Sequence, residues 1–297
     1  MDILDEIAAV LGGRLLSRET LAGGFSHETA LVTLTDRRVV VRSGGGDPAV
    51  EAAVMAAAAP WVPVPDVLLV RPDALVISYV EGTPLSEVLD RGGRPGRMRA
   101  LGAEVGRVAA AVRGVTLDRR GFFAGPDLSV KEEPPWSAQL AGVAEWCMAR
   151  VPPDRLDPGT RREWIALCAR HAPALTVADR HTRLVHADLN PKNILVTEVP
   201  GGWRVDALLD WEFAYAGSPW ADAGNMARFG ADYPDGFLAG FADSFEADPY
   251  AARVLDMFAL SDLATRAPGH EIADRAAGVI RAWVRDGVPL DYDNRSD

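Results

Sequence analysis

The feature that most constrains this chain is a polar loop followed by a β-hairpin in the second half of the sequence. Two aliphatic runs, at 194–196 and 205–209, flank the turn-forming segment Pro200-Gly201-Gly202, which predicts two antiparallel strands joined by a tight connection. Asn193 immediately precedes the first strand and Asp210 follows the second. Because antiparallel pairing aligns the start of one strand with the end of the next, we expect these two side chains at the same end of the hairpin.

Asn193 and Asp210 both offer oxygen atoms, and such ligands suit Mg²⁺, which is commonly shared between one or two carboxylates and substrate phosphates. Asp188, five positions before Asn193, can lie beside that metal and accept the proton of an attacking hydroxyl. We therefore predict Asp188 as the catalytic residue and Asn193 and Asp210 as metal ligands. The alternative is a loop in which His186 and Asp188 only satisfy backbone donors. The presence of Asn193 and Asp210 at matching ends of the two hairpin strands argues against it.

The segment His186-Ala187-Asp188 through Asn193, followed by Asp210-Trp211-Glu212, resembles the aminoglycoside phosphotransferase and choline kinase family, which is related to the protein kinases. Gly217-Ser218-Pro219 and Asp222 resemble the next motif of that family, and the resemblance extends over residues 15 to 230. It implies an ATP-dependent (or GTP-dependent) and Mg²⁺-dependent transfer of phosphate to a hydroxyl of a small molecule, as in antibiotic resistance.

Individual positions qualify the resemblance. Ala187 stands where family members often have glycine, and His186 is implied to support the loop. Asp222 is implied to be an internal structural acid, and we predict that it caps its helix. Lys192 is either a contact to the transferred phosphate or a solvated loop lysine.

Residues 1–80 read as a small antiparallel sheet with one helix. Short β-prone runs occur at 15–21, 30–34, 39–42, 67–70 and 74–80. Asp47 and Pro48 are typical of a helix start, and the alanine-rich run continues to Ala59.

Residues 81–297 read as mainly helical apart from the hairpin. Thr83-Pro84 is a helix-start signal, and residues 91–97 look like a loop. Apolar residues then recur at spacings of three and four, which predicts one buried face of a long helix; they are Met98, Leu101, Val105, Val108 and Val112. The prediction is an α+β, bilobal, protein kinase-like fold. It has an N-terminal nucleotide-binding lobe (1–80) and a larger C-terminal catalytic and substrate-binding lobe (81–297).

The resemblance also places the nucleotide in the first lobe. Gly24 and Ser26 belong to a segment that resembles the turn covering the phosphates. Arg42 occupies the position of the lysine that contacts the α- and β-phosphates, in a chain whose only lysines are Lys131 and Lys192.

Glu51 matches the family's partner for that cation, so we predict a buried Arg42–Glu51 ion pair. The alternative is that both are ordinary solvent-exposed residues. The Ser78 carbonyl and the Val80 N–H are implied to bind adenine.

The formal net charge of −11 argues against nucleic-acid binding, which needs a basic surface. It favours a cationic acceptor such as an aminoglycoside or a basic peptide antibiotic. Residues 231–297 contain 13 acidic and 6 basic side chains, and Asp262, Glu271 and Asp274 are candidate acceptor contacts. The alternative is a solvated helical surface.

The sequence contains no apolar run of membrane-spanning length and no export signal, so no membrane partner is expected. Cys147 and Cys168 lack metal-ligand spacing, which is consistent with a cytoplasmic protein.

Other activities remain open at this point. They are a kinase of choline or an amino alcohol, a nucleotide-binding pseudokinase suggested by the missing lysine, and a metal-dependent phosphoesterase using His181, His186 and Asp188.

Overall fold

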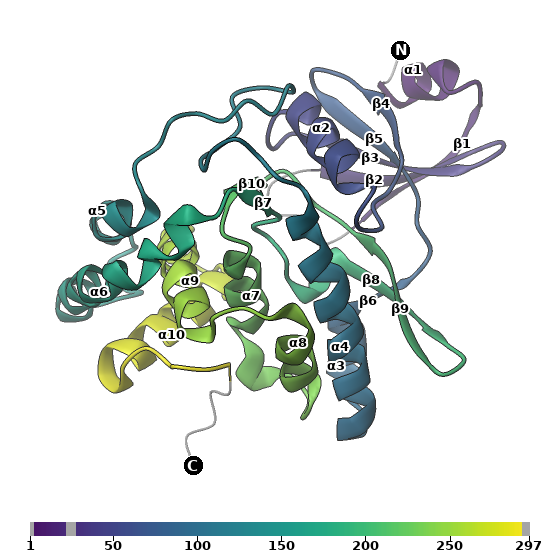
Figure 1. Ribbon diagram of the computed structural model, residues 1–297. Helices are drawn as coiled ribbons and strands as arrows, with labels where there is room; N and C mark the ends of the chain where they lie inside the picture. Colours follow the sequence, from purple (N-terminus) through teal and green to yellow (C-terminus); the bar gives the residue numbers. More distant parts are fainter. Residues whose placement is uncertain (1–2, 22–27, 293–297) are drawn as a thin grey trace.

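The computed structural model describes residues 3–21 and 28–292, and its N-terminal part is a five-stranded antiparallel sheet (Figure 1). The strand order is β1-β2-β3-β5-β4. The strands are β1 (Leu15–Thr20), β2 (Glu28–Leu34), β3 (Arg38–Ser43), β4 (Val67–Val70) and β5 (Ala74–Ser78). Helix α2 (Pro48–Ala58) connects β3 to β4, and the Asp47 side chain caps it by accepting a hydrogen bond from the Ala49 N–H at 2.9 Å. The predicted sheet and its inserted helix are confirmed.

The two faces of this sheet are covered differently. An additional helix that the sequence pattern did not predict, α1 (Ile3–Val10), packs Leu4 and Ile7 against Val39 and Val41 on the outer face. Since side chains alternate along a strand, Arg42 points to the opposite face, where it meets α2. The sheet therefore directs Arg42 toward the second half of the chain.

The C-terminal part is mainly helical, as expected. Its helices are α3 (Leu85–Arg91), α4 (Pro95–Ala111), α5 (Trp136–Met148), α6 (Pro158–His171), α7 (Trp220–Ala227), α8 (Phe237–Phe245), α9 (Pro249–Leu263) and α10 (Glu271–Asp286). The predicted apolar face of α4 is buried throughout. None of the helices in the described parts of the chain has the length and apolar character that crossing a membrane requires.

The helix expected after the start signal Thr83-Pro84 is present, because α3 begins at Leu85, although Thr83–Pro84 themselves form a short strand, β6, that pairs with Leu195 and Val196. Another local prediction was wrong. The supposed loop at 91–97 is shorter because α4 already begins at Pro95, a favourable first helical position. The largest hydrophobic cluster contains residues from both sides of position 80, among them Ile77 and Leu85, and the lobe boundary itself remains a prediction.

The predicted hairpin is present as β8 (Ile194–Val199) and β9 (Gly202–Leu208), with Ile194 opposite Leu208. The Leu209 N–H donates to the Asn193 carbonyl at 2.8 Å, so the pairing continues to the open end of the hairpin. Strand β7 (Arg183–Val185) pairs with β10 (Tyr215–Gly217). Together these pairs bring the loop after β7 and the segment after β9 to one place.

Helices α4 and α8 approach so closely that a glycine is required at the contact. A Cβ on Gly102 would lie 2.0 Å from the Phe237 carbonyl oxygen, which forces the two helices apart. We expect Gly102→Ala to lower the free energy of unfolding by about 1–3 kcal/mol, measured by urea denaturation. Gly278→Ala is the matched control, because Gly278 lies inside α10 with nothing within 4 Å of its added Cβ. It should raise stability by about 0.5–1 kcal/mol, and equal effects at the two sites would contradict this packing.

Candidate active site

Asp188 lies in the loop after β7, where two side-chain amides hold its carboxylate. Asn190 Nδ2 donates to Asp188 Oδ1 at 2.9 Å, and Asn193 Nδ2 donates to Asp188 Oδ2 at 2.8 Å. Burial, and then the nearby charge of Asp210, raise the pKa of Asp188 to about 6, against the opposing influence of Asn190, Arg228 and Asn193. The carboxylate is thus fixed in orientation, and its pKa suits proton transfer near neutrality.

Asn193 and Asp210 supply oxygen atoms at the open end of the hairpin. The Asn193 amide nitrogen donates to both the carbonyl and the carboxylate of Asp188, which leaves the amide oxygen to face a ligand. Asp210 has a left-handed backbone conformation, with φ of 68°, and its side chain is about a quarter exposed. This donor set of one amide and one carboxylate oxygen fits Mg²⁺, which completes its coordination with waters and phosphates.

Arg42 forms ion pairs with residues of both halves of the chain beside Asp210. One terminal nitrogen, Nη1, donates to Glu51 Oε1 on α2, and the other, Nη2, donates to Asp210 Oδ1 at 2.5 Å. Glu51 Oε1 also accepts the Trp211 N–H at 3.2 Å. Burial acts to lower the pKa of Arg42, but Glu51 and Asp210 outweigh it and the pKa is raised. The structure therefore contains the Arg42–Glu51 pair that the sequence analysis anticipated, and it adds Asp210 as a second partner.

The backbone of the loop that carries Asp188 is held by hydrogen bonds to α7. Asp222 Oδ2 accepts the His186 N–H at 2.9 Å, and Asp222 Oδ1 accepts the Ala187 N–H at 2.8 Å. The prediction that Asp222 caps its own helix was wrong, because Pro219 occupies the cap position without a side-chain bond. The φ of Ala187 is 68°, a region that glycine enters without strain, so Ala187 adopts a conformation that a glycine would take more easily.

His186 supports the loop, as the resemblance implied. Its ring is fully buried, Nε2 lies 2.9 Å from the Leu209 carbonyl oxygen, and it packs against Trp211 at a centroid distance of 4.4 Å. Burial lowers the pKa of His186 to about 4, so the imidazole is neutral at physiological pH.

No group of three or more His, Cys, Asp or Glu side chains in residues 3–21 and 28–292 is placed to hold a metal. His181 instead lies 2.9 Å from Ser218 Oγ through Nδ1 and packs edge-on against Trp220. This arrangement gives no support to the phosphoesterase alternative, which needs a richer ligand set.

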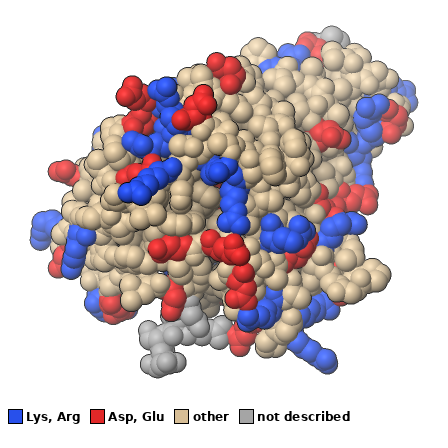
Figure 2. Space-filling view, in the orientation of Figure 1, with Lys and Arg blue, Asp and Glu red and all other residues tan. Residues whose placement is uncertain are grey.

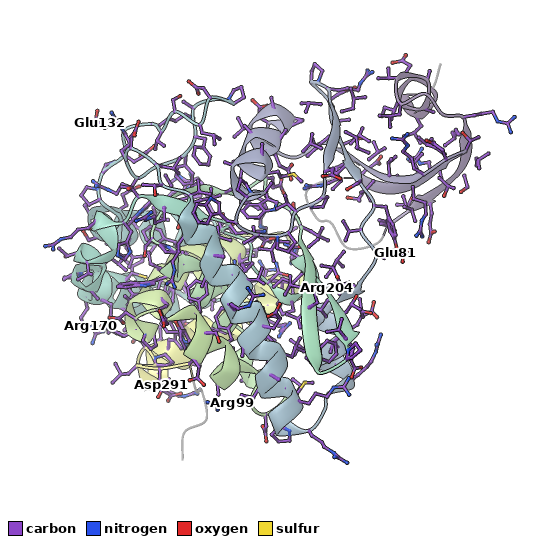
Figure 3. The ribbon with its side chains drawn as sticks, turned by 45° about the vertical axis from the view of Figure 1, so that its right-hand side comes forward. Glu81, Arg99, Glu132, Arg170, Arg204 and Asp291 are labelled. Carbon is purple, nitrogen blue, oxygen red and sulfur yellow. The ribbon has the colours of Figure 1, made fainter. Side chains whose placement is uncertain are left out.

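Ser78 ends β5 and Val80 follows it in the connection between the two parts. Figure 3 shows Glu81 on this connection, where it pairs with Arg38 at 2.5 Å. The roles of Ser78 and Val80 in adenine binding remain predictions. Gly24 and Ser26 lie outside the described residues.

The acidic residues proposed to bind the acceptor mostly have local partners. Asp262 pairs with Arg266 at 3.0 Å within one turn, and Asp274 pairs with Arg155 at 2.8 Å. Glu271 is exposed at the start of α10. None of these hydrogen bonds involves residues 186–193 around Asp188, and Lys192 is exposed.

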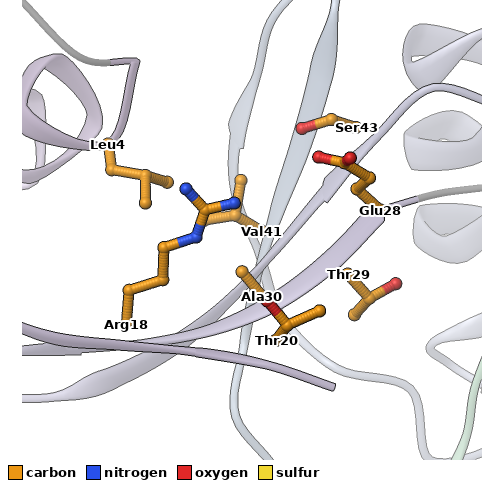
Figure 4. A pocket seen from close by; sticks show the side chains of 8 residues that line it. All are labelled: Leu4, Arg18, Thr20, Glu28, Thr29, Ala30, Val41 and Ser43. Atoms are coloured by element: carbon orange, nitrogen blue, oxygen red, sulfur yellow. The ribbon is translucent and has the colours of Figure 1, made fainter. Parts of the chain in front are cut away.

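A cavity of about 270 Å³ lies on the outer face of the sheet, beneath α1 (Figure 4). Arg18, Glu28 and Ser43 line it together with apolar side chains including Leu4 and Val41. Because Val41 and Arg42 point to opposite faces of β3, this cavity is separate from the cluster around Asp188.

Residues 17–255 match the model of the phosphotransferase enzyme family. The chain belongs to this family. The chain is thus a phosphotransferase enzyme, and the suspected relationship is confirmed by a match over more than half of its length. No curated protein sequence matches the chain significantly.

Solved structures similar to this phosphotransferase confirm the kinase-like α+β fold. A thermostable mutant of aminoglycoside phosphotransferase APH(4)-Ia, in a ternary complex with ADP and hygromycin B, is 18% identical with a TM-score of 0.74, covering 97% of this chain and 100% of that chain. The macrolide 2'-phosphotransferase MphH from Brachybacterium faecium is 20% identical with a TM-score of 0.61 and full coverage of both chains. A putative fructosamine-3-kinase from Thermobifida fusca is 17% identical with a TM-score of 0.62, covering 95% of this chain and 99% of that chain.

Proposed function

We propose that this phosphotransferase moves the γ-phosphoryl group of ATP, or of GTP, onto a hydroxyl of a small molecule. The observation that carries the proposal is the convergence of Asp188, Asn193, Asp210 and Arg42 at the open end of one hairpin. The ADP and AMP-PNP complexes of the APH(4)-Ia mutants support the choice of nucleotide.

In this proposal Asn193 and Asp210 hold Mg²⁺, which when bound neutralises charge on the phosphates. Asp188 orients the acceptor hydroxyl and accepts its proton as the new O–P bond forms, while the bond from the γ-phosphorus to the β,γ-bridging oxygen breaks and the nucleoside diphosphate leaves with that oxygen. Arg42 contacts the α- and β-phosphates, with Glu51 fixing its planar fork. Since phosphoryl transfer has a loose transition state, these residues act mainly by positioning and by charge.

We propose a cationic acceptor such as an aminoglycoside or a basic peptide antibiotic, and neither a nucleic acid nor a membrane as partner. The net charge of −11 supports this choice. Of the three candidate contacts, Glu271 is exposed, whereas Asp262 and Asp274 already pair with Arg266 and Arg155. On the face shown in Figure 2, acidic and basic side chains are interspersed, so attraction would come from the overall charge. We also place the protein in the cytoplasm, where ATP is available and the thiols of Cys147 and Cys168 stay reduced.

An acceptor screen tests the proposal. The protein is incubated with Mg²⁺ and ATP against aminoglycosides, basic peptide antibiotics, macrolides, choline and amino alcohols, and products are analysed by mass spectrometry. We expect the mass gain of a single phosphate on a cationic acceptor, dependent on ATP and Mg²⁺. Turnover on neutral acceptors alone would refute the cationic class, and turnover on choline would favour the metabolite-kinase alternative. The absence of transfer, with intact nucleotide binding, would favour the pseudokinase alternative.

A further inference from the structure

Helix α7 presents a polar stripe beneath the catalytic loop, on a helix that is otherwise apolar and buried. Asn225 lies three positions after Asp222, and Arg228, the C-cap residue of the helix, lies three positions after Asn225. Residues at this spacing share one helical face. All three are at most 8% exposed, so the stripe serves contacts inside the protein.

Asn225 binds the loop on the side that Asp222 does not reach. Its Nδ2 donates to the Ala187 carbonyl at 2.9 Å, while Asp222 accepts the Ala187 N–H. Both polar groups of this left-handed residue are therefore held by the same helix. Ala187 immediately precedes Asp188, so its peptide orientation determines where the Asp188 carboxylate points.

The orientation of the Asn225 amide is fixed by chemistry. Its Oδ1 is buried and has no hydrogen-bond partner within the described segments. Reversing the amide would place two acceptor oxygens against each other at Ala187. The bond from Nδ2 to the Ala187 carbonyl therefore sets the amide in this orientation and ties α7 to the residue before Asp188.

Arg228 anchors the end of the helix that carries Asn225. Its Nε and Nη2 form a forked contact with Asp256 of α9, with the shortest distance 2.6 Å, and both side chains are buried. This pair fixes α7 relative to α9, so the stripe forms a rigid support.

From this geometry we infer that Asn225 is a positioning residue for phosphoryl transfer. It holds the Ala187 peptide so that the Asp188 carboxylate faces the acceptor hydroxyl, and the Arg228–Asp256 pair keeps the supporting helix in place. The inference rests on the proposed function of Asp188, and it adds a residue to which no role in that function has been assigned.

Two substitutions test it. Asn225→Asp keeps the size but loses the donor when ionised, and Asn225→Leu removes the donor without burying a charge. We expect either to lower kcat by about 10–100-fold with the KM for ATP changed less than about twofold, the size of effect typical when a supporting hydrogen bond is lost. Amide hydrogen exchange of the loop peptide spanning 184–196 should also become at least about tenfold faster, since its opening is no longer resisted.

Met226→Val is the matched control, because Met226 is a fully buried neighbour on the same helix that contributes to the hydrophobic core. It should lower the melting temperature while leaving kcat and loop exchange unchanged. If Asn225→Leu behaves like Met226→Val at equal loss of stability, or leaves loop exchange unaltered, the inference is wrong. If wild-type protein transfers no phosphate, the proposed function fails, and the exchange measurement still decides whether Asn225 holds the loop.

Discussion

Asp188→Asn should reduce kcat for phosphoryl transfer by about 10²–10⁴-fold, the range associated with loss of a positioned proton acceptor. The substitution preserves the size of the side chain, and both of its partners, Asn190 and Asn193, also donate to the Asp188 carbonyl. Nucleotide affinity should therefore change less than about twofold, because binding is assigned to Arg42 and the metal site. Single-turnover kinetics and calorimetric titration with AMP-PNP separate the two quantities.

The control for this prediction is Asp243→Asn. Asp243 forms an exposed ion pair with Arg99 on the surface of α8 and α4, and its loss should leave kcat unaltered. Retention of more than about a tenth of wild-type kcat by Asp188→Asn would remove Asp188 from the role of proton acceptor.

Arg42→Met should be strongly destabilising as well as inactivating. The side chains of Arg42 and Glu51 are 8% and 7% exposed, so the substitution leaves a buried carboxylate without its cation. Breaking such a buried pair typically costs about 3–5 kcal/mol. We expect a loss of this size in urea unfolding at pH 7.5, together with a rise in the KM for ATP of at least about tenfold if phosphate contact is lost.

The loss of unfolding free energy in Arg42→Met should depend on pH. Burial raises the pKa of Glu51 and Arg42 opposes that rise, so removing Arg42 favours the protonated carboxyl in the folded state. A carboxyl with a raised folded-state pKa stabilises the fold at low pH, and this contribution is lost as pH increases through that pKa. The deficit of Arg42→Met should therefore be smaller at pH 5 than at pH 7.5.

Arg38→Met provides the comparison on the same strand and face. Its ion pair with Glu81 is solvent-exposed, so the cost should be within about 1 kcal/mol and nearly independent of pH. Equal losses for Arg38→Met and Arg42→Met would mean that the predicted Arg42–Glu51 pair does not stabilise the protein.

The parts of the structure that could be predicted from the sequence are those determined by residues close together in the chain. The hairpin follows from β-prone runs around Gly201-Gly202, and α2 follows from Asp47 and Pro48 at its start. Convergence of Asn193 and Asp210 could be predicted because the hairpin alone dictates it. Helix α1 was missed because its apolar positions have meaning only once the outer face of the sheet exists to cover.

The hydrogen bonds and ion pairs of buried polar residues could not be predicted from the sequence, because the bonded residues lie far apart in the chain. Asp222 binds amides 35 and 36 residues earlier, and Asp274 pairs with Arg155 across 119 positions. The polar residues at 222, 225 and 228 within an apolar helix were a usable signal, because buried polar groups require partners. The identity of those partners depended on tertiary structure.

The most direct measurement is a crystal structure of the protein with Mg²⁺ and AMP-PNP. We expect a metal coordinated by the Asn193 amide oxygen and the Asp210 carboxylate at about 2.0–2.1 Å, with Arg42 at the phosphates and Asp188 facing the γ-phosphate. A nucleotide bound away from the open end of the β8–β9 hairpin, or a metal held without Asn193 and Asp210, would contradict it.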